Sequence, residues 1–267
     1  MSRLLDALRQ AARRLILVVT GAGASRASGI PTFRGREPEA VWKQEDMALA
    51  TRRALELDPV AQWSWYLRRF ERLERARPNP AHRALAELER WQVGRGGGFL
   101  LVTQNIDTLH EQAGSRRLIK VHGSSDRLRC SRPGCRNGAP TGSLDRSRVD
   151  LAPFRRSAER RHLPTCPECG ALLRAHVLFF DETYDEHVDY RFDEVQRAAD
   201  EAALMIFIGT SFSVGVTDLL VRAAARRGAP RLSVDPAAAP QPTWNGVETL
   251  AAAAEDLLPA VCRRLSP

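Results

Sequence analysis

The sequence predicts a doubly wound α/β fold with a smaller inserted lobe, and three observations support this class. Short apolar runs alternate with stretches of helical spacing, several of these runs end in small or polar residues, and two cysteine pairs lie in one polar stretch. Alternating strands and helices are typical of an open parallel sheet. Ligands of such sheets bind beyond the carboxyl ends of the strands.

The elements of the large domain are expected in a regular order. Leucines and alanines at helical spacing over residues 2–14 predict a docked helix rather than a transit peptide, because a strand follows at once. Strands are expected at 15–20, 99–103, 118–121, 204–208 and 231–234, and further helices at 81–91, 191–203 and 217–227. We assign residues 1–36, 80–123 and 185–267 to this domain.

The smaller lobe is expected to consist of two pieces. Residues 37–79 have a helical pattern rich in tryptophan and other aromatics, and residues 124–184 carry the cysteine pairs without a clear period. We expect the first piece to be helical and the second to be a zinc-binding module.

The cysteine spacing predicts a structural zinc site. Cys130 and Cys135 form one knuckle and Cys166 and Cys169 a second, each in turn-forming sequence. Four thiolate ligands complete a tetrahedral site and leave no position for water. Two disulfides are the alternative, but the chain shows no secretion signal, so we expect a reducing, cytoplasmic compartment. Cys262 is expected in the core.

The charge does not predict a nucleic-acid partner. The net charge is +8, but nearly all basic residues are arginines, scattered along the chain, and only Lys43 and Lys120 are lysines. This skew is typical of codon bias. No apolar run approaches the roughly 20 residues that span a bilayer, so we expect no membrane partner either.

Glycines and polar residues follow the predicted strands. Gly21 and Gly23 match only half of a dinucleotide fingerprint, because Arg26 stands at the third glycine. Asp107 could simply cap a helix. His122 stands apart from His82, His110, His176 and His187, which we expect to be solvated or hydrogen-bonded, because it ends a strand.

These motifs together resemble the sirtuins. GAGAS, SGIPTFRG, TQNID with LHEQAG behind it, VHGS, the two cysteine pairs and GTS occur in the order of that family, between about residues 15 and 235. The resemblance implies a Rossmann-like domain with a small zinc-binding lobe. It also implies NAD-dependent removal of acyl groups from lysines of proteins or peptides, giving nicotinamide and O-acyl-ADP-ribose.

The resemblance also implies roles for individual residues. His122 matches the catalytic base, with a pKa expected near neutrality, and Asn105 and Asp107 match residues that act with it. The residues that match the cofactor site are Gly21, Ala22, Ser25, Phe33, Arg34, Gln104, Asn105, Asp107, Gly209, Thr210, Ser211 and Asp235.

The segment 173–182 resembles the family's strand that pairs with substrate, which makes Val177 and Phe180 candidate substrate-binding residues. Ala175 replaces the usual proline and Asp181 the usual glycine. A carboxylate at 181 that faces the substrate should favour basic peptides.

Tyr66 and Arg69 have the spacing that recognises succinyl and malonyl groups in the desuccinylase branch of the family. Residues at i and i+3 share a helix face, so a hydroxyl and a guanidinium could bind an acyl carboxylate together. The alternative is a core tyrosine beside a solvated arginine.

Two other functions remain open. The same cofactor site could serve an NAD glycohydrolase or a mono-ADP-ribosyltransferase. A non-catalytic NAD-responsive or nucleic-acid-binding module would need neither Asn105 nor His122. The zinc module and the substrate-pairing segment favour the deacylase, because hydrolysis of NAD alone needs neither.

Overall fold

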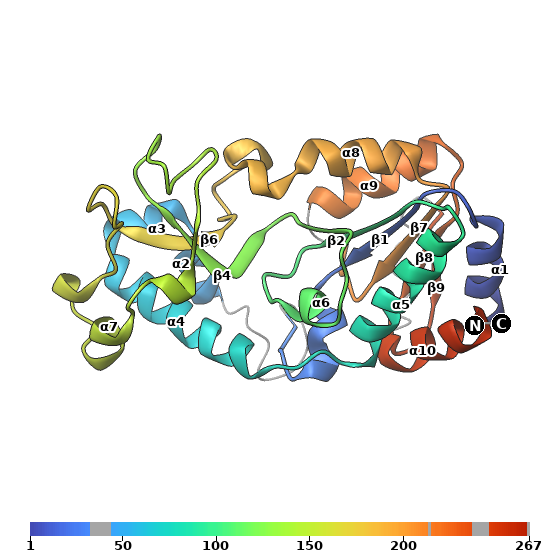
Figure 1. The fold of residues 1–267 in the computed structure, drawn as a ribbon, viewed down its shortest axis with the longest axis horizontal. Coiled ribbons are helices and arrows are strands. Elements are labelled where there is room, and N and C mark those ends of the chain that lie inside the picture. Colours follow the sequence, from blue (N-terminus) through green and yellow to red (C-terminus); the bar gives the residue numbers. More distant parts are fainter. Residues whose placement is uncertain (33–43, 213–214, 237–245, 266–267) are drawn as a thin grey trace.

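The fold consists of a large and a small lobe side by side along the longest axis (Figure 1). It comes from a computed structural model, which describes residues 1–32, 44–212, 215–236 and 246–265. Both chain ends lie at the far end of the large lobe. Among the described residues no helix has the length and apolar character needed to cross a membrane.

The large lobe is built on a parallel six-stranded sheet in the order β3-β2-β1-β7-β8-β9. The strands are β1 (Ile16–Thr20), β2 (Phe99–Thr103), β3 (Leu118–Lys120), β7 (Leu204–Ile208), β8 (Arg231–Val234) and β9 (Glu248–Leu250). The predicted parallel sheet is confirmed. The strand order reverses between β1 and β7, which is where such sheets bind ligands.

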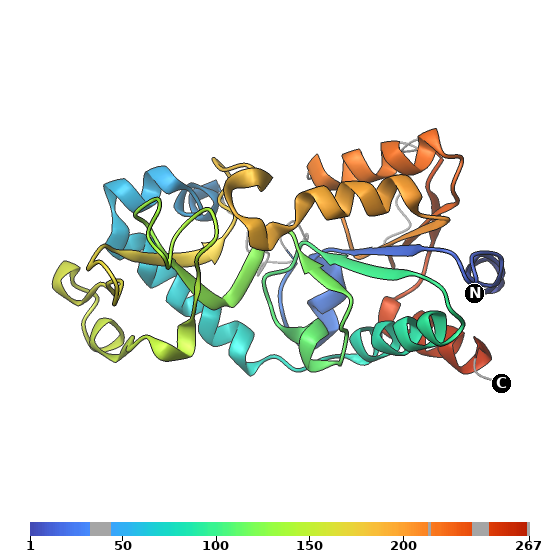
Figure 2. The same cartoon turned by 45° about the horizontal axis from the view of Figure 1, so that its top comes forward.

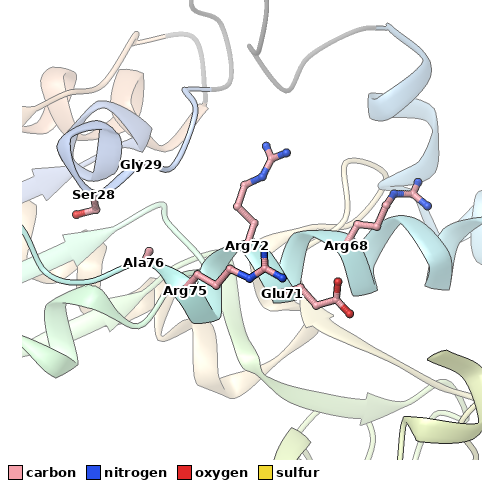
Figure 3. Close-up of a pocket in the computed structure, with 7 residues that line it drawn as sticks. All are labelled: Ser28, Gly29, Arg68, Glu71, Arg72, Arg75 and Ala76. Carbon is pink, nitrogen blue, oxygen red and sulfur yellow. The ribbon is translucent and has the colours of Figure 1, made fainter. Parts of the chain in front are cut away.

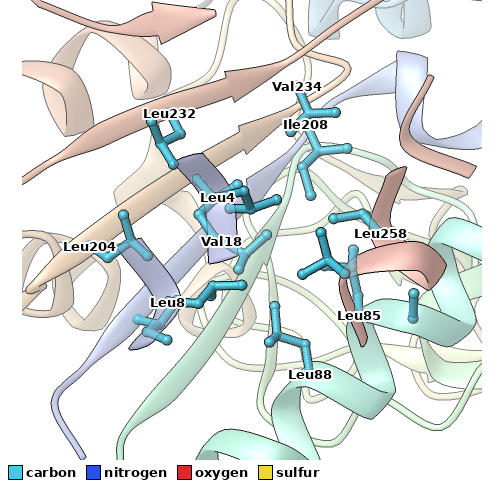
Figure 4. Packing of buried hydrophobic residues seen from close by; sticks show 14 of the residues in the cluster. Leu4, Leu8, Val18, Leu85, Leu88, Leu204, Ile208, Leu232, Val234 and Leu258 are labelled. Carbon is cyan, nitrogen blue, oxygen red and sulfur yellow. The ribbon is translucent and has the colours of Figure 1, made fainter. Parts of the chain in front are cut away.

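Helices cover both faces of this sheet. One face packs against α1 (Ser2–Gln10), α5 (Pro80–Gly94) and α10 (Ala254–Leu265), through an apolar cluster that includes Leu4, Leu85 and Leu258 (Figure 4). The other packs against α8 (Phe192–Glu201) and α9 (Gly215–Arg226). The central strands β1, β2 and β7 are therefore buried on both sides, as their near-continuous apolar sequences require.

Local sequence determines where α5 begins. Asn79 Oδ1 accepts hydrogen bonds from the backbone N–H groups of Ala81 and His82, at 2.9 and 3.3 Å. The His82 ring accepts one in return from the N–H of Asn79. Pro80 occupies the first helical position, where no donor is needed. This capping fixes the segment that joins the lobes.

The small lobe has its own sheet and apolar core (Figure 2). The antiparallel sheet has the order β5-β4-β6, with β4 (Gly123–Cys130), β5 (Leu144–Asp145) and β6 (Leu173–Val177). The helices α2 (Gln44–Leu49), α3 (Arg52–Leu57), α4 (Pro59–Arg75) and α7 (Ala152–Arg156) pack with it. Trp63, Phe70 and Phe154 are almost fully buried in this core.

The boundaries proposed for the two lobes remain a prediction. The segment just after residue 185 contacts the small lobe, although the sequence assigned it to the large one. The ring of His187 lies 3.0 Å from the Gly142 carbonyl oxygen, and Val188 N–H donates to the Pro140 carbonyl at 2.9 Å.

Candidate active site

Two glycine loops meet at the carboxyl edge of β1 and β7. Gly21 N–H donates to the Ile208 carbonyl at 3.0 Å and Gly23 N–H to the Gly209 carbonyl at 2.9 Å. A Cβ on Gly23 would lie 2.6 Å from the Gly209 Cα, and Gly209 itself has a φ of +56°. These glycines let the two backbones touch, whether or not a ligand is present.

A buried polar network links the loop after β1 to the loop after β2. Asn105 Nδ2 donates to the Gly21 carbonyl at 3.0 Å and to Ser25 Oγ at 3.1 Å, and Ser25 Oγ donates to Asp107 Oδ2 at 2.9 Å. Asn105 Oδ1 is buried and has no hydrogen-bond partner among the described residues. A buried unpartnered acceptor is a position for a donor on a bound ligand.

Asp107 does more than cap a helix. Its Oδ1 accepts from Leu109 N–H at 3.0 Å, which caps α6 (Leu109–Gln112), while its Oδ2 accepts from Ser25. Asp107 can therefore both cap a helix and belong to the cofactor site, because each role uses a different carboxylate oxygen.

His122 lies at the same edge, directly after Val121, and its hydrogen bonds define its tautomer. Its Nδ1 lies 2.8 Å from the Gln104 carbonyl oxygen and its Nε2 3.2 Å from the Tyr184 hydroxyl. A carbonyl oxygen only accepts, so Nδ1 carries the proton and Nε2 presents a lone pair. Nε2 is thus the basic nitrogen.

Burial lowers the pKa of His122 to about 4, with the Gln104 carbonyl partly opposing the shift. The expected near-neutral pKa is wrong for this environment, because removing the ring from water disfavours its charged form. The consequence is a histidine that is neutral at pH 7 and ready to accept a proton.

The remaining predicted cofactor residues have different surroundings. Gln104 Nε2 donates to Thr210 Oγ1 at 3.2 Å, which joins the β2 and β7 loops. Ser211 is exposed, Ala22 is half-buried, and Asp235 is half-buried just after β8. Phe33 and Arg34 lie outside the described residues.

The predicted substrate segment lies against the histidine. Leu178 N–H donates to the His122 carbonyl at 3.0 Å, and Val177 pairs with Gly123. Val177 is buried, whereas Phe180 is 56% exposed. Any group that binds beside this strand end therefore lies close to His122.

Asp181 contacts the start of a small-lobe helix. Its Oδ1 accepts from the backbone N–H of Arg52 at 2.7 Å and its Oδ2 from that of Arg53 at 3.2 Å. The carboxylate therefore satisfies free N–H groups at the start of α3. The effect of Asp181 on peptide preference stays a prediction, which holds only if the carboxylate also faces a bound peptide.

Tyr66 and Arg69 share one face of α4, as their spacing predicted. Tyr66 is 3% exposed and its ring lies against Phe179, with centroids 5.9 Å apart. The guanidinium of Arg69 lies over the Trp65 ring at 4.6 Å. Burial raises the pKa of Tyr66, and the positive charge of Arg69 partly opposes this.

The four predicted zinc ligands come together. Cys130 Sγ lies 3.5 Å from Cys169 Sγ, Cys135 Sγ lies 3.8 Å from Cys166 Sγ, and all four sulfurs are within 4.8 Å of one another. Sulfurs bound to zinc at about 2.3 Å in a tetrahedron are about 3.8 Å apart, far longer than a disulfide. These thiols fit zinc; the ion would have a structural role.

A separate pocket of about 310 Å³ lies between α4 and the 3₁₀ helix η1 (Ala22–Ser28). Arg68, Arg72 and Arg75 project from α4, and Ser28 lies opposite them (Figure 3). None of its lining residues belongs to the predicted site.

Comparisons with known proteins agree with this arrangement. The model of the Sir2 family matches residues 21–216. The chain belongs to the Sir2 family. An NAD-dependent protein deacylase of Thermus thermophilus is 40% identical over 242 residues, covering 88% of this chain and 87% of the relative. Mitochondrial sirtuin-5 of Danio rerio, an NAD-dependent protein deacylase, is 34% identical over 232 residues, covering 80% and 72%.

Solved structures of the family share the fold of this Sir2 chain. A Sir2 homologue in complex with NAD superimposes with a TM-score of 0.79 at 33% identity, covering 99% of this chain and 93% of its own.

Two residues of this Sir2 chain escaped the sequence analysis. The side chain of Glu182 is fully buried and pairs with Arg174, Arg129 and Arg52. Burial favours its neutral form, but Arg174 outweighs this and lowers the pKa of Glu182 to about 2. Tyr184 contacts His122. No local pattern marks either residue, because Arg52 and Arg129 lie more than fifty residues from Glu182, and His122 lies 62 residues from Tyr184.

Replacing Tyr184 with Phe is expected to raise the pKa of His122 by about 0.5–1 unit, the effect of one neutral hydrogen bond. Burial raises the pKa of Tyr184 to about 12, so it keeps its proton and donates to Nε2, which stabilises neutral His122. The acidic limb of the kcat/KM profile should move to higher pH. Asp185→Ala, in the same turn, is the control. If the acidic limb lay at the same pH in both variants, the hydrogen bond from Tyr184 to Nε2 would be contradicted.

Proposed function

We propose that this chain is an NAD-dependent protein deacylase that removes acyl groups from lysine side chains. It transfers the acyl group to ADP-ribose and releases nicotinamide. The observation that carries this function is the position of His122, which adjoins both the polar network of the glycine loop and the substrate-pairing segment.

The chain's residues divide the chemistry among them. NAD supplies the ADP-ribose that accepts the acyl group. His122 accepts the ribose hydroxyl proton at Nε2, because its Nδ1 proton is held by the Gln104 carbonyl. For this step the ribose hydroxyl takes the place of the Tyr184 hydroxyl, which otherwise donates to Nε2. Asn105 presents its unpartnered Oδ1 to the ligand, and Ser25 holds Asp107 in place. Hydrogen bonds already hold Ser25, Asn105 and Asp107 in place, so these three side chains need little rearrangement to act.

The glycohydrolase and ADP-ribosyltransferase alternatives use the cofactor site alone. The hydrogen bond from Leu178 to His122 places a strand end beside the base, which those reactions do not need. The geometry therefore favours transfer from a bound peptide.

Product analysis by mass spectrometry tests this function. The protein is incubated with NAD and acetyl-, succinyl- and longer-acyl-lysine peptides. We expect free lysine peptide together with O-acyl-ADP-ribose in equal amounts. Consumption of NAD without loss of the acyl group would instead support the glycohydrolase.

We further propose that the enzyme accepts dicarboxylic acyl groups as well as acetyl. Tyr66 and Arg69 are three residues apart on α4 and so share one face of that helix. Tyr66 packs on Phe179, which precedes the candidate substrate residue Phe180. A cation here supplies the attraction that a carboxylate-bearing acyl group needs.

Arg69→Met is expected to lower kcat/KM for succinyl-lysine about 10–100-fold, the loss of a charged hydrogen bond of about 1.5–3 kcal/mol. Activity on acetyl-lysine should stay unchanged, because methionine can still cover the Trp65 ring. Arg68→Met is the matched control on the exposed side of the helix. An equal loss on both substrates would show that Arg69 only supports the fold.

We also propose a cytoplasmic location and no dedicated nucleic-acid role. The four clustered thiols are in the reduced form that a reducing compartment maintains, and the fifth cysteine, Cys262, is a buried thiol. Fractionation of cells that express the protein, and salt-dependent DNA binding of the purified chain, would test both statements.

A further inference from the structure

Three side chains of metal-ligand type meet outside the four-cysteine site. His176 lies on β6, His187 lies just before the 3₁₀ helix η5 (Val188–Tyr190), and Asp189 lies within η5. The two histidines are 1% and 2% exposed, whereas the Asp189 side chain is 43% exposed. One side of the cluster is therefore buried and the other is open to water.

The separations of the donor atoms suit a shared ion. Asp189 Oδ2 lies 3.1 Å from His176 Nε2 and 3.6 Å from His187 Nδ1, and the three ligand atoms are within 4.8 Å of one another. Two ligands at about 2.0–2.2 Å from a tetrahedral zinc ion are about 3.3–3.6 Å apart. Both nitrogen-to-oxygen distances are close to this range.

His176 lacks the hydrogen bonds that a buried ring normally makes. Neither ring nitrogen makes a well-formed hydrogen bond among the described residues, although Asp189 Oδ2 lies 3.1 Å from Nε2, within ion-pair distance. A buried nitrogen left this way calls for an ion or water as its partner. Stacking on Tyr190, at 5.7 Å, holds the ring in place.

The other two residues have the supporting contacts of metal ligands. The His187 ring lies 3.0 Å from the Gly142 carbonyl oxygen at Nε2, so Nε2 carries the proton and Nδ1 has the lone pair. Ser143 Oγ donates to Asp189 Oδ2 at 3.1 Å. A carbonyl behind the histidine and a donor on the carboxylate orient metal ligands in this manner.

Two contacts oppose metal binding, and neither prevents it. The Asp189 backbone N–H donates to His187 Nδ1 at 3.1 Å, a hydrogen bond that the ion must displace. The positive charge of Arg129 lies nearby, but Arg129 is paired with Glu182 at 3.1 Å. The net contribution of such a hydrogen bond to stability is only about 1 kcal/mol, less than a metal–imidazole bond supplies.

We propose that His176, His187 and Asp189 bind a second divalent transition-metal ion, separate from the four-cysteine site. Two imidazoles and one carboxylate suit zinc, and the exposed side leaves a position for water. The ion ties β6, which carries Val177, to the segment that leads into α8. It thereby stiffens the stretch that contains Tyr184.

Metal stoichiometry of the intact chain tests this proposal. The protein is equilibrated with buffered micromolar zinc, and zinc per chain is measured by mass spectrometry. We expect two equivalents in the native chain and one in Asp189→Ala. Asp185→Ala, an exposed aspartate in the preceding turn, is the matched control and should keep two. In cobalt-loaded protein, the second equivalent should add absorption without sulfur-to-cobalt charge-transfer bands.

Asp189→Asn covers the case in which the alanine variant misfolds, because it keeps the size and an acceptor for Ser143. It should retain one tight zinc ion and bind the second at least about tenfold more weakly. A single equivalent in the native chain would overturn the proposal. So would an Asp189→Asn variant that binds the second ion with native affinity.

Discussion

His122→Ala is expected to lower the rate of deacylation by about 10²–10⁴-fold, the usual contribution of a positioned general base. The ring presents its Nε2 lone pair beside the strand end that pairs with substrate, and Nδ1 is held by Gln104. Release of nicotinamide should be affected less, because no proton transfer to Nε2 precedes it in the mechanism implied by the family. The measurement is kcat for the acyl-lysine peptide alongside exchange of labelled nicotinamide.

His162→Ala is the control for this prediction. His162 lies on a short 3₁₀ helix of the small lobe, and its ring contacts the Ser157 carbonyl. The variant should keep native rates. If His122→Ala deacylated at the native rate, His122 would not be the general base. Its contact with the Gln104 carbonyl would then have no catalytic role.

Cys166→Ser is expected to release the structural zinc and to destabilise the small lobe by several kcal/mol. Cys166 is 2% exposed and belongs to the apolar core of that lobe, so losing the ion also leaves a polar group in the core. For a chain of this size the midpoint of thermal unfolding should fall by about 10 °C or more. Zinc content and a thermal melt of the same sample measure both effects.

Cys262→Ser provides the matched control. Cys262 is similarly buried, on α10, and lies outside the cysteine cluster. The variant should keep its zinc and lose less stability than Cys166→Ser. The comparison separates the effect of replacing a buried sulfur by oxygen from the effect of losing the zinc ion. If Cys166→Ser retained a tightly bound ion at the cluster, four-cysteine coordination would be contradicted.

Much of the fold could be predicted because its signals are local. The strands at 99–103, 204–208 and 231–234 match β2, β7 and β8 residue for residue. The first two are short, almost wholly apolar runs that end at a polar residue or glycine. The two cysteine pairs could be predicted as zinc ligands for a similar reason, because the spacing of the two ligands in each pair is set by a single turn.

Two features of the site could not be predicted, for a common reason. The sequence did not show that Asp181 accepts from the first N–H groups of α3, which lie well over a hundred residues away in sequence. The near-neutral pKa expected for His122 ignored burial by other segments, which lowers it. Neither effect is visible along the chain.

The sequence by itself determined the order of the elements, the residues at the carboxyl edge of the sheet and the zinc ligands. These follow from periodicity and from motifs of a few residues, in which neighbours in sequence act together. Only the tertiary structure decided which proton His122 carries, that Tyr184 contacts it, and that His176 meets Asp189. Such contacts join residues from separate elements, and their distances exist only after the chain has packed.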